Sequence, residues 1–135
     1  MLMSERGAAG DRDDRPTANG SPRIVVVGPC ASGKSSLVDA LRARGYDAHV
    51  SAQEHSAIAS LWQHTRPDIV IALEVDISAV HTRRGDDWPE WLHDVQVQRL
   101  QSASVAADLT IDTTDLDQDG VIDRAVAYLA ARAVE

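Results

Sequence analysis

The chain has 135 residues, of which 44% are hydrophobic and 25% charged, and it carries a formal net charge of −8 at pH 7. This length suffices for one domain with a modest core, and the negative charge argues against nucleic acid or an anionic membrane as a partner, because both normally require a basic surface. The single cysteine excludes an intramolecular disulfide, and no apolar segment is long enough to span a bilayer or to form a signal peptide, so we expect a cytoplasmic protein.

Residues 1–21 differ in composition from the rest of the chain. They are rich in Gly, Asp, Arg, Pro, Ser and Asn and have almost no apolar residue after Met3, which is typical of a disordered leader. Residues 22–135 contain regularly spaced apolar segments, so we predict one folded domain there. Its first element is a strand at 23–27, where four β-branched apolar residues follow an arginine, as in a strand buried on both faces.

Immediately after this strand, residues 28–35 read GPCASGKS and fit the pattern G-x-x-x-x-G-K-[ST] in full. In such a loop, Gly28 and Gly33 let backbone N–H groups converge on a phosphate at the N-terminus of the next helix. Lys34, the only lysine of the chain, would contact the β- and γ-phosphates, and the Ser35 hydroxyl would bind Mg²⁺. The expected nucleotide-contacting residues of this region are Gly28, Pro29, Cys30, Ala31, Ser32, Gly33, Lys34, Ser35 and Ser36.

The remaining apolar patterns predict strands that alternate with helices. Short apolar segments predict three further strands, at 46–50, 68–76 and 108–112. Apolar residues at helical spacing predict five helices, at 34–44, 56–65, 77–84, 89–104 and 120–133. In the second of these helices, Ile58, Leu61 and Trp62 fall on one face. Such alternation indicates an α/β fold with a small, mostly parallel sheet of four to five strands and right-handed crossovers.

The order of these parts resembles the small-molecule kinases of the P-loop NTPase superfamily, such as the shikimate, gluconate, adenylylsulfate, dephospho-coenzyme A and nucleotide kinases. Four pieces carry the resemblance, and they lie at residues 28–35, 67–75, 83–84 and 107–113. The resemblance implies a three-layer αβα P-loop NTPase fold, ATP and Mg²⁺ as cofactors, and transfer of the γ-phosphoryl group to a small-molecule hydroxyl or phosphate acceptor. The sequence leaves open which acceptor is used and whether the chain is a monomer or a homodimer.

The segment after the second predicted strand differs from these kinases. They usually carry a longer substrate-binding insertion with an acidic residue there, whereas this chain has only Gln53, Glu54, His55 and one short predicted helix. The alternative is therefore a nucleotide-binding regulator or slow NTPase without an acceptor site. A Ras-like GTPase is excluded, because its guanine-reading Asn-Lys-x-Asp motif needs a lysine that this chain does not have, and ATP is favoured over GTP for that reason.

Two acidic residues are candidates for metal binding and proton transfer. Glu54 follows the second predicted strand and Asp76 ends the third, and the carboxyl ends of parallel strands meet where the glycine-rich loop begins. Either carboxylate could bind Mg²⁺ together with Ser35, or accept the proton of an acceptor hydroxyl. For Asp76 the alternative is a cap on the following helix. Gln53 and His55 flank Glu54 and could contact an acceptor, although a single histidine is more often structural.

Three arginines are candidates for contacts with phosphate. Arg83 and Arg84 precede a polar turn where a lid could close, and guanidinium groups stabilise charge in a phosphoryl-transfer transition state; the alternative is an ordinary cation at a helix C-terminus. Arg99 lies on the side of its predicted helix that carries Trp91, and we expect it to bind the nucleotide. The predicted catalytic residues are Lys34, Glu54, Arg83 and Arg84, and the predicted metal ligands are Ser35, Glu54 and Asp76.

Other patterns are interpreted as structural. Residues 115–123 match the first nine positions of a calcium-binding loop, but Val126 stands where a bidentate glutamate is needed. We therefore expect Asp119 to cap the last helix. Cys30 is interpreted as a small filler residue in its loop. The three tryptophans, Trp62, Trp88 and Trp91, are expected in the core.

Overall fold

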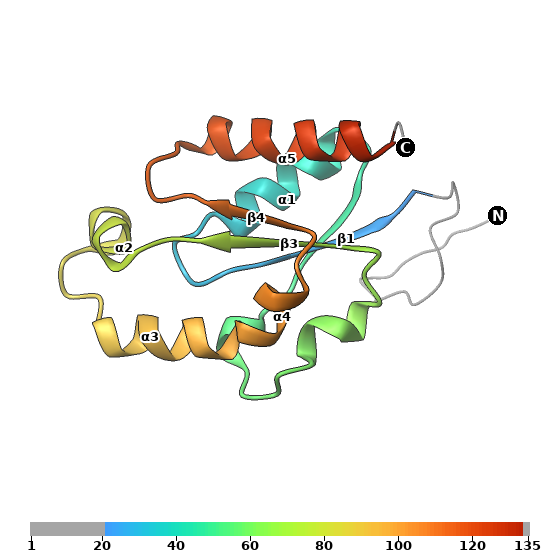
Figure 1. Cartoon of the computed structure of the whole chain (residues 1–135). Helices are drawn as coiled ribbons and strands as arrows, with labels where there is room; N and C mark the ends of the chain where they lie inside the picture. The colour runs from blue at the N-terminus through green and yellow to red at the C-terminus, as the bar shows by residue number, and fades with distance from the viewer. Residues whose placement is uncertain (1–20, 134–135) are drawn as a thin grey trace.

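The computed structural model describes residues 21–133, and in this part of the chain it contains one sheet of four parallel strands (Figure 1). The strands are β1 (Arg23–Val27), β2 (Asp47–Val50), β3 (Ile69–Glu74) and β4 (Leu109–Asp112). Their order in the sheet is β2-β1-β3-β4, and all three pairings are parallel. The predicted α/β class is confirmed, with four strands. The predicted leader lies outside the described residues, apart from Ser21.

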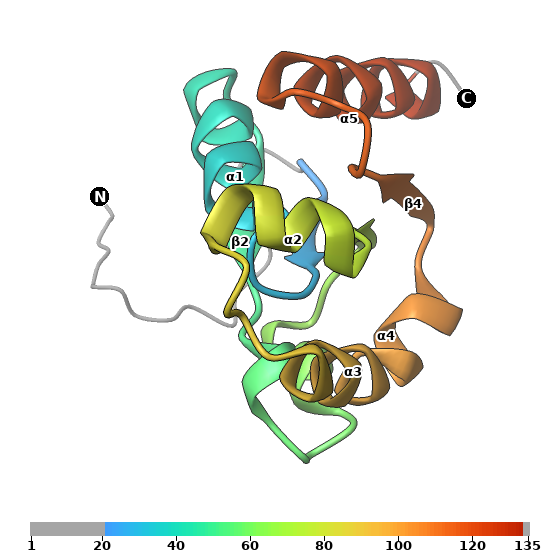
Figure 2. The ribbon, with the colours of Figure 1, turned by 90° about the vertical axis from the view of Figure 1, so that its left-hand side faces the viewer.

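Helices cover both faces of the sheet, so the described residues form three layers (Figure 1). One face is covered by α1 and α5 and the other by α3, α4 and the two 3₁₀ helices, while α2 lies in front of the carboxyl ends of the strands (Figure 2). The helices are α1 (Lys34–Ala43), η1 (Gln53–His55), η2 (Leu61–Thr65), α2 (Ile77–Arg84), α3 (Glu90–Arg99), α4 (Gln101–Ala106) and α5 (Gln118–Ala133). None of them is long and apolar enough to cross a membrane.

The core lies on both sides of β1, as its continuous apolar sequence predicts. Ile24 and Val26 belong to the larger apolar cluster under α1 and α5, whereas Val25 and Val27 belong to a second cluster that includes Trp62 on the opposite face. The side chains of all four of these residues are fully buried. Successive side chains of a strand point to opposite faces, so only a strand covered on both faces buries such a sequence completely.

The prediction of a helix at 56–65 is wrong. This segment forms turns followed by the short 3₁₀ helix η2, and Ile58, expected on an apolar face, is exposed. The cause is the fully buried Gln53 side chain, which accepts a hydrogen bond from the Trp62 backbone N–H (3.0 Å) and donates one to the Ile58 carbonyl (2.8 Å). Side-chain hydrogen bonds of this kind compete with those of a helix. Gln53 is therefore a structural residue and does not present its amide to an acceptor.

The helix predicted at 89–104 is interrupted. It consists of α3 and α4, which are separated by Leu100. The Leu100 side chain is buried in the second apolar cluster, on the face opposite α1 and α5. The break gives the two helices different directions, so that α4 covers the sheet while α3 extends toward the glycine-rich loop (Figure 1).

The tryptophans occupy three different environments. Trp62 is buried as expected, and Trp88 is half-buried. The expectation for Trp91 is wrong, because its side chain is 67% exposed. The buried residues of α3 are instead His93 and Gln96, so this helix packs inward through polar side chains.

The order of the strands determines where a ligand can bind. From β1 the chain crosses through α1 to the edge strand β2, whereas from β3 it crosses through α2, α3 and α4 to the opposite edge strand β4. In open parallel sheets, ligands bind beyond the carboxyl ends of the strands at the point where such connections diverge. Here that point lies between β1 and β3. Residues 28–35, called the glycine loop below, leave β1 at this position.

Candidate nucleotide-binding site

The two glycines of the glycine loop are required for different reasons. A Cβ atom on Gly28 would lie 2.6 Å from the Ser32 Oγ atom and 3.0 Å from the Leu73 carbonyl oxygen, so the strand β3 leaves no room for a side chain. Gly33 has open space around it but adopts φ = 93°, the left-handed conformation that favours glycine. Ala31 adopts φ = 71°, which is uncommon for a residue with a Cβ atom. The loop is thus tightly constrained between β1 and α1.

The N-terminus of α1 has no side-chain cap. Gly33 is the residue that precedes the helix, and it has no side chain that could accept a hydrogen bond from the first turn. The first backbone N–H groups of a helix have no partner within the helix, and the helix dipole makes this end attractive to anions. The ten-residue α1 therefore offers a suitable position for a phosphate group.

Lys34 is held inside the glycine loop by three oxygen atoms. Its Nζ donates to the carbonyls of Gly28 (2.8 Å) and Pro29 (3.3 Å), and it forms an ion pair with the Glu54 Oε2 atom at 2.6 Å. The side chains of Lys34 and Glu54 are 11% and 4% exposed. The structure thus brings together two of the predicted site residues, which lie on α1 and η1, and the buried carboxylate is neutralised by the ammonium group.

Two buried oxygen atoms of the site have no hydrogen-bond partner among the residues that the structure describes. They are the Ser32 Oγ atom in the glycine loop and the Glu54 Oε1 atom. Buried polar atoms are paired in most folded proteins, so exceptions often mark a functional position. Both residues therefore have hydrogen-bonding capacity that the described residues do not use.

Gln96 on α3 holds the glycine loop from the other face of the sheet. Its Oε1 atom accepts a hydrogen bond from the Cys30 backbone N–H (2.9 Å), and its Nε2 donates to the Cys30 Sγ atom (3.3 Å). Sequence reasoning missed Gln96, for which the only signal was a glutamine in a helix near the site. Arg99, on the same helix, donates to the Glu54 carbonyl at 3.4 Å, so it contacts η1 and not the glycine loop.

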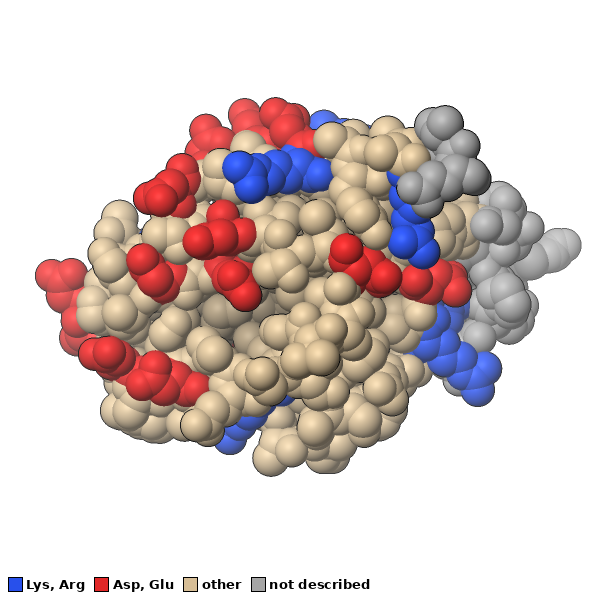
Figure 3. Space-filling view, in the orientation of Figure 1, with Lys and Arg blue, Asp and Glu red and all other residues tan. Residues whose placement is uncertain are grey.

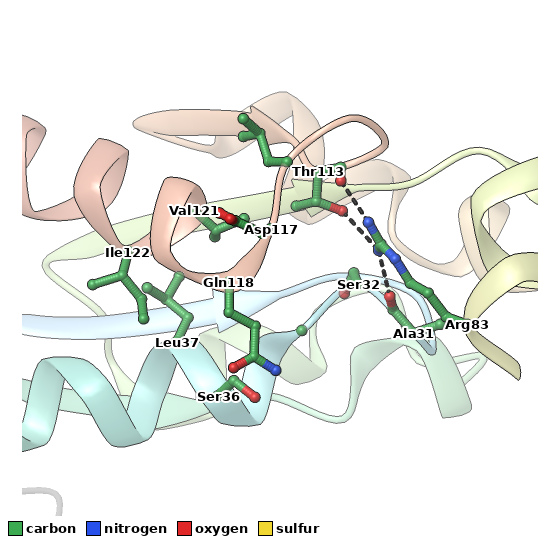
Figure 4. Close-up of a pocket in the computed structure, with 12 residues that line it drawn as sticks. Ala31, Ser32, Ser36, Leu37, Arg83, Thr113, Asp117, Gln118, Val121 and Ile122 are labelled. Carbon is green, nitrogen blue, oxygen red and sulfur yellow. Dashed lines mark hydrogen bonds between the residues drawn. The ribbon is translucent and has the colours of Figure 1, made fainter.

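Arg83 connects three segments that are far apart in the sequence. Its guanidinium donates to the Ala31 carbonyl (2.7 Å), the Thr113 Oγ1 atom (3.2 Å) and the Thr113 carbonyl (2.6 Å), as Figure 4 shows. Thr113 in turn donates from Oγ1 to the Glu74 carbonyl at the end of β3. Arg83 on α2 thus joins the glycine loop to the connection between β4 and α5, and its predicted position at the site is consistent with this geometry.

Two other predicted site residues have structural partners. The Arg84 guanidinium lies over the Trp88 ring, 5.5 Å from its centroid, a cation–π arrangement. The Asp76 carboxylate accepts a hydrogen bond from the Ala79 backbone N–H (2.8 Å) and so caps α2. The geometry of Asp76 therefore matches the cap that the sequence left as the alternative.

A pocket of about 270 Å³ opens beside the glycine loop (Figure 4). Its lining combines loop residues, the Arg83 side chain and the start of α5. Apolar walls come from Leu37 on α1 and from Val121 and Ile122 on α5. The lining residues are Ala31, Ser32, Gly33, Ser36, Leu37, Arg83, Thr113, Leu116, Asp117, Gln118, Val121 and Ile122.

The two serines after Lys34 lie in the first turn of α1. Ser35 is exposed and Ser36 is half-buried. Ser36 lines the pocket. This side of the pocket lies within the segment that the sequence motif singled out. The opposite wall, residues 113–122, overlaps the segment that resembles a calcium-binding loop, and the sequence did not predict it as part of a nucleotide site.

The connection between β4 and α5 is stabilised by aspartates. Asp117 accepts a hydrogen bond from the Gly120 backbone N–H (2.8 Å) at the start of α5, so the prediction that Asp119 caps this helix is wrong. The helix begins two residues earlier than expected, at Gln118. At the end of β4, hydrogen bonds from Thr114 lower the pKa of Asp112 from its usual 3.8.

The face of the described residues seen in Figure 3 shows no continuous basic patch. On the face shown in Figure 3, acidic side chains are spread over the end of the molecule near α2 and along the middle, while Lys and Arg side chains are fewer and separate. This face therefore offers no broad positive surface for a polyanion, and binding there would depend on local groups.

No protein-family model matches this chain, and a search of the curated proteins finds no match.

Proposed function

We propose that the chain is a P-loop NTPase-like protein that binds ATP with Mg²⁺ and transfers the γ-phosphoryl group to a small-molecule hydroxyl or phosphate acceptor. The observation that carries the proposal is the position of the pocket, which adjoins the glycine loop and is bounded by Arg83 and the start of α5. A triphosphate on the loop would direct its nucleoside into this pocket.

The phosphate side of the proposal is supported by the loop geometry. The uncapped α1 N-terminus provides backbone N–H groups and a favourable dipole. Lys34 already lies within the loop, where it donates to the carbonyl of Gly28. A Cβ atom at Gly28 would collide with the Ser32 side chain and with the backbone of β3, so this position of the loop requires glycine.

The nucleoside side of the proposal is supported by the lining of the pocket. Its volume of about 270 Å³ is close to the lower end of small-molecule sites. Leu37 and Ile122 provide apolar surface for an aromatic base, and Asp117 and Gln118 provide polar groups that could hydrogen-bond its edge.

Ser35 is the best candidate for an Mg²⁺ ligand among the three predicted residues. Mg²⁺ prefers oxygen ligands, and the Ser35 hydroxyl is exposed in the first turn of α1. Of the other two candidates, Asp76 is engaged as a cap and Glu54 is paired with Lys34. When bound, Mg²⁺ would neutralise charge on the phosphates. The residues that would orient the phosphates and stabilise charge during transfer are Lys34 and Arg83, because both have donors at the glycine loop.

A second candidate function is a nucleotide-binding regulator or slow NTPase, and the geometry of η1 favours it. The Glu54 carboxylate is buried and paired with Lys34, and the Gln53 amide is used inside the protein. Of the three polar residues of η1, only His55 is exposed. The segment therefore offers few groups that could bind an acceptor.

The proposal is tested in two steps. First, calorimetric titration with a non-hydrolysable ATP analogue and Mg²⁺ should show binding, and a matched titration without Mg²⁺ should show weaker binding. Second, ADP release is measured with ATP and a panel of nucleosides, sugars and acids. Release that depends on an acceptor supports the kinase; binding with release at the water background for every acceptor supports the regulator. Absence of any nucleotide binding contradicts both.

A further inference from the structure

Three different donor atoms lie together beside the glycine loop, outside the pocket. The Cys30 Sγ atom is 3.9 Å from the His55 Nε2 atom, and this nitrogen is 3.5 Å from the Glu54 Oε2 atom. The thiol, one carboxylate oxygen and the imidazole nitrogen all lie within 4.8 Å of one another. Cys30 comes from the glycine loop, whereas Glu54 and His55 come from η1, so the fold brings together residues that are 24 and 25 positions apart.

The Glu54 carboxylate provides a second observation that points to a ligand. Its Oε2 atom is paired with Lys34, whereas its Oε1 atom is buried and has no hydrogen-bond partner among the residues that the structure describes. The oxygen that lies 3.5 Å from His55 is the Lys34-paired Oε2, so a metal at the cluster would share this oxygen with the ammonium group, while Oε1 leaves the carboxylate with unused capacity to bind. The His55 side chain, which is 60% exposed, leaves the cluster accessible from solvent.

The donor types indicate which metal the cluster would take. Thiolate and imidazole ligands suit zinc and related transition metals, whereas Mg²⁺ prefers oxygen ligands. Zinc sites with three protein ligands and one water are common. Tetrahedral zinc requires a sulfur–nitrogen separation of about 3.6 Å and a nitrogen–oxygen separation of about 3.3 Å, and both observed distances exceed these by only a few tenths of an ångström. The thiol–carboxylate distance has to shorten as well.

We propose that Cys30, Glu54 and His55 form a site for Zn²⁺ or a related divalent transition metal, with water as the fourth ligand. On binding, the Cys30 thiol releases its proton to solvent, and the sulfur binds the metal as a thiolate. Lys34 remains paired with Glu54. Its positive charge disfavours the metal, whereas the negative Cys30 thiolate favours it. The metal links the glycine loop to η1, and this function is separate from the Mg²⁺ expected with ATP.

The test uses Co²⁺ as a spectroscopic probe, with the full chain, reduced and without nucleotide. The expected result is the visible absorption of a tetrahedral site together with a thiolate-to-cobalt charge-transfer band in the near ultraviolet, and both should be displaced by Zn²⁺. Cys30→Ser should abolish the charge-transfer band. His55→Ala should weaken Co²⁺ binding at least about tenfold, since even indirect partners of metal ligands contribute that much.

A matched control is His64→Ala, which removes an exposed histidine of η2 outside the cluster. It should leave both the spectrum and the affinity unchanged. Absence of the charge-transfer band in the wild type would overturn the proposal, and so would equal losses of affinity in His55→Ala and His64→Ala. If Cys30→Ser melts early because it disturbs the contact with Gln96, the exposed His55 variant still decides the question. Because no nucleotide is present, this outcome is independent of the proposed kinase activity.

Discussion

The two sides of the glycine loop differ in how they are built. On the pocket side, the walls come from α1, α5 and the Arg83 side chain of α2, and polar groups remain at the pocket lining. On the η1 side, residues 53–65 form only 3₁₀ helices and turns. The buried polar side chains there, Gln53 and Glu54, are used in internal contacts, whereas His55 and His64 are exposed. The pocket side has the features of a site for an organic ligand, whereas the η1 side, apart from the proposed metal site, has those of a structural connection.

Under the proposed function, this difference accounts for a phosphate-donor site without an evident acceptor site among the described residues. The donor side depends on close packing and on a helix N-terminus, both of which come from the regular α/β architecture. The η1 side depends on one buried glutamine and one buried ion pair. The predictions below test whether the two sides are as independent as the geometry indicates, beginning with the residue pair that joins them.

The Lys34–Glu54 ion pair should give the largest effect. Lys34→Met leaves the buried Glu54 carboxylate without its partner, so we expect a loss of about 3 kcal/mol in the free energy of unfolding. Nucleotide affinity should fall by about 10- to 100-fold, since a charged hydrogen-bond donor to phosphate is lost. Chemical denaturation and calorimetric titration measure the two effects.

The double variant Lys34→Met/Glu54→Gln is the matched control for this pair. It should recover most of the stability, because the unpaired buried charge is gone, but none of the nucleotide affinity. Equal stability losses in the single and double variants would contradict the buried pair as the cause.

Gly28→Ala should have the next largest effect. The new methyl group would meet the Leu73 backbone and the Ser32 hydroxyl, so we expect a loss of about 1 to 3 kcal/mol in stability together with weaker nucleotide binding. Gly33→Ala is the matched variant, because its surroundings are open and only the left-handed backbone is strained; it should cost about 1 kcal/mol. Thermal melting compares them, and a Gly28→Ala protein as stable as the wild type would exclude the packing argument.

Gln53→Ala tests the η1 side by itself. It removes the acceptor for the Trp62 N–H and the donor to the Ile58 carbonyl, so the free energy of unfolding should fall by about 1 to 2 kcal/mol. The affinity for ATP should be unchanged, since Gln53 does not line the pocket. A parallel loss of affinity would show that the η1 side and the pocket side are coupled, which would contradict their independence.

The sequence predicted the parts of the site that depend on local pattern. Lys34 and the glycines follow from one contiguous motif, and β1 follows from its apolar run. Gln53 and Gln96 could not be predicted, because each acts through contacts with residues 9 and 66 positions away, respectively, which no local pattern records. The cap of α5 was misplaced because Asp115, Asp117 and Asp119 alternate at similar spacing, and only the packing of the turn selects Asp117.

Arg83 and Arg84 give a smaller and more selective effect. Arg83→Ala should weaken nucleotide binding by about tenfold, because the contacts that join the glycine loop to Thr113 are lost. Arg84→Ala removes an adjacent charge whose partner is the Trp88 ring, so its nucleotide affinity should stay near that of the wild type. Calorimetric titration measures both affinities. If only the lost positive charge matters, the two variants should lose affinity equally; if the contacts of Arg83 matter, only Arg83→Ala should lose it.

Asp112 should give the smallest effect, and it concerns pH. Hydrogen bonds from Thr114 lower the pKa of Asp112 below its usual 3.8, so the folded state favours the charged carboxylate. The resulting stabilisation is present above pH 3.8 and is lost as the pH falls through the lowered pKa. Asp112→Asn keeps an acceptor oxygen for the Thr114 N–H but cannot titrate, so its melting temperature should lie slightly below that of the wild type at neutral pH and approach it in acid. Because Asp112 is exposed, the difference should also shrink in high salt. A gap that is constant from neutral to acidic pH would mean that the carboxylate charge does not stabilise the connection between β4 and α5.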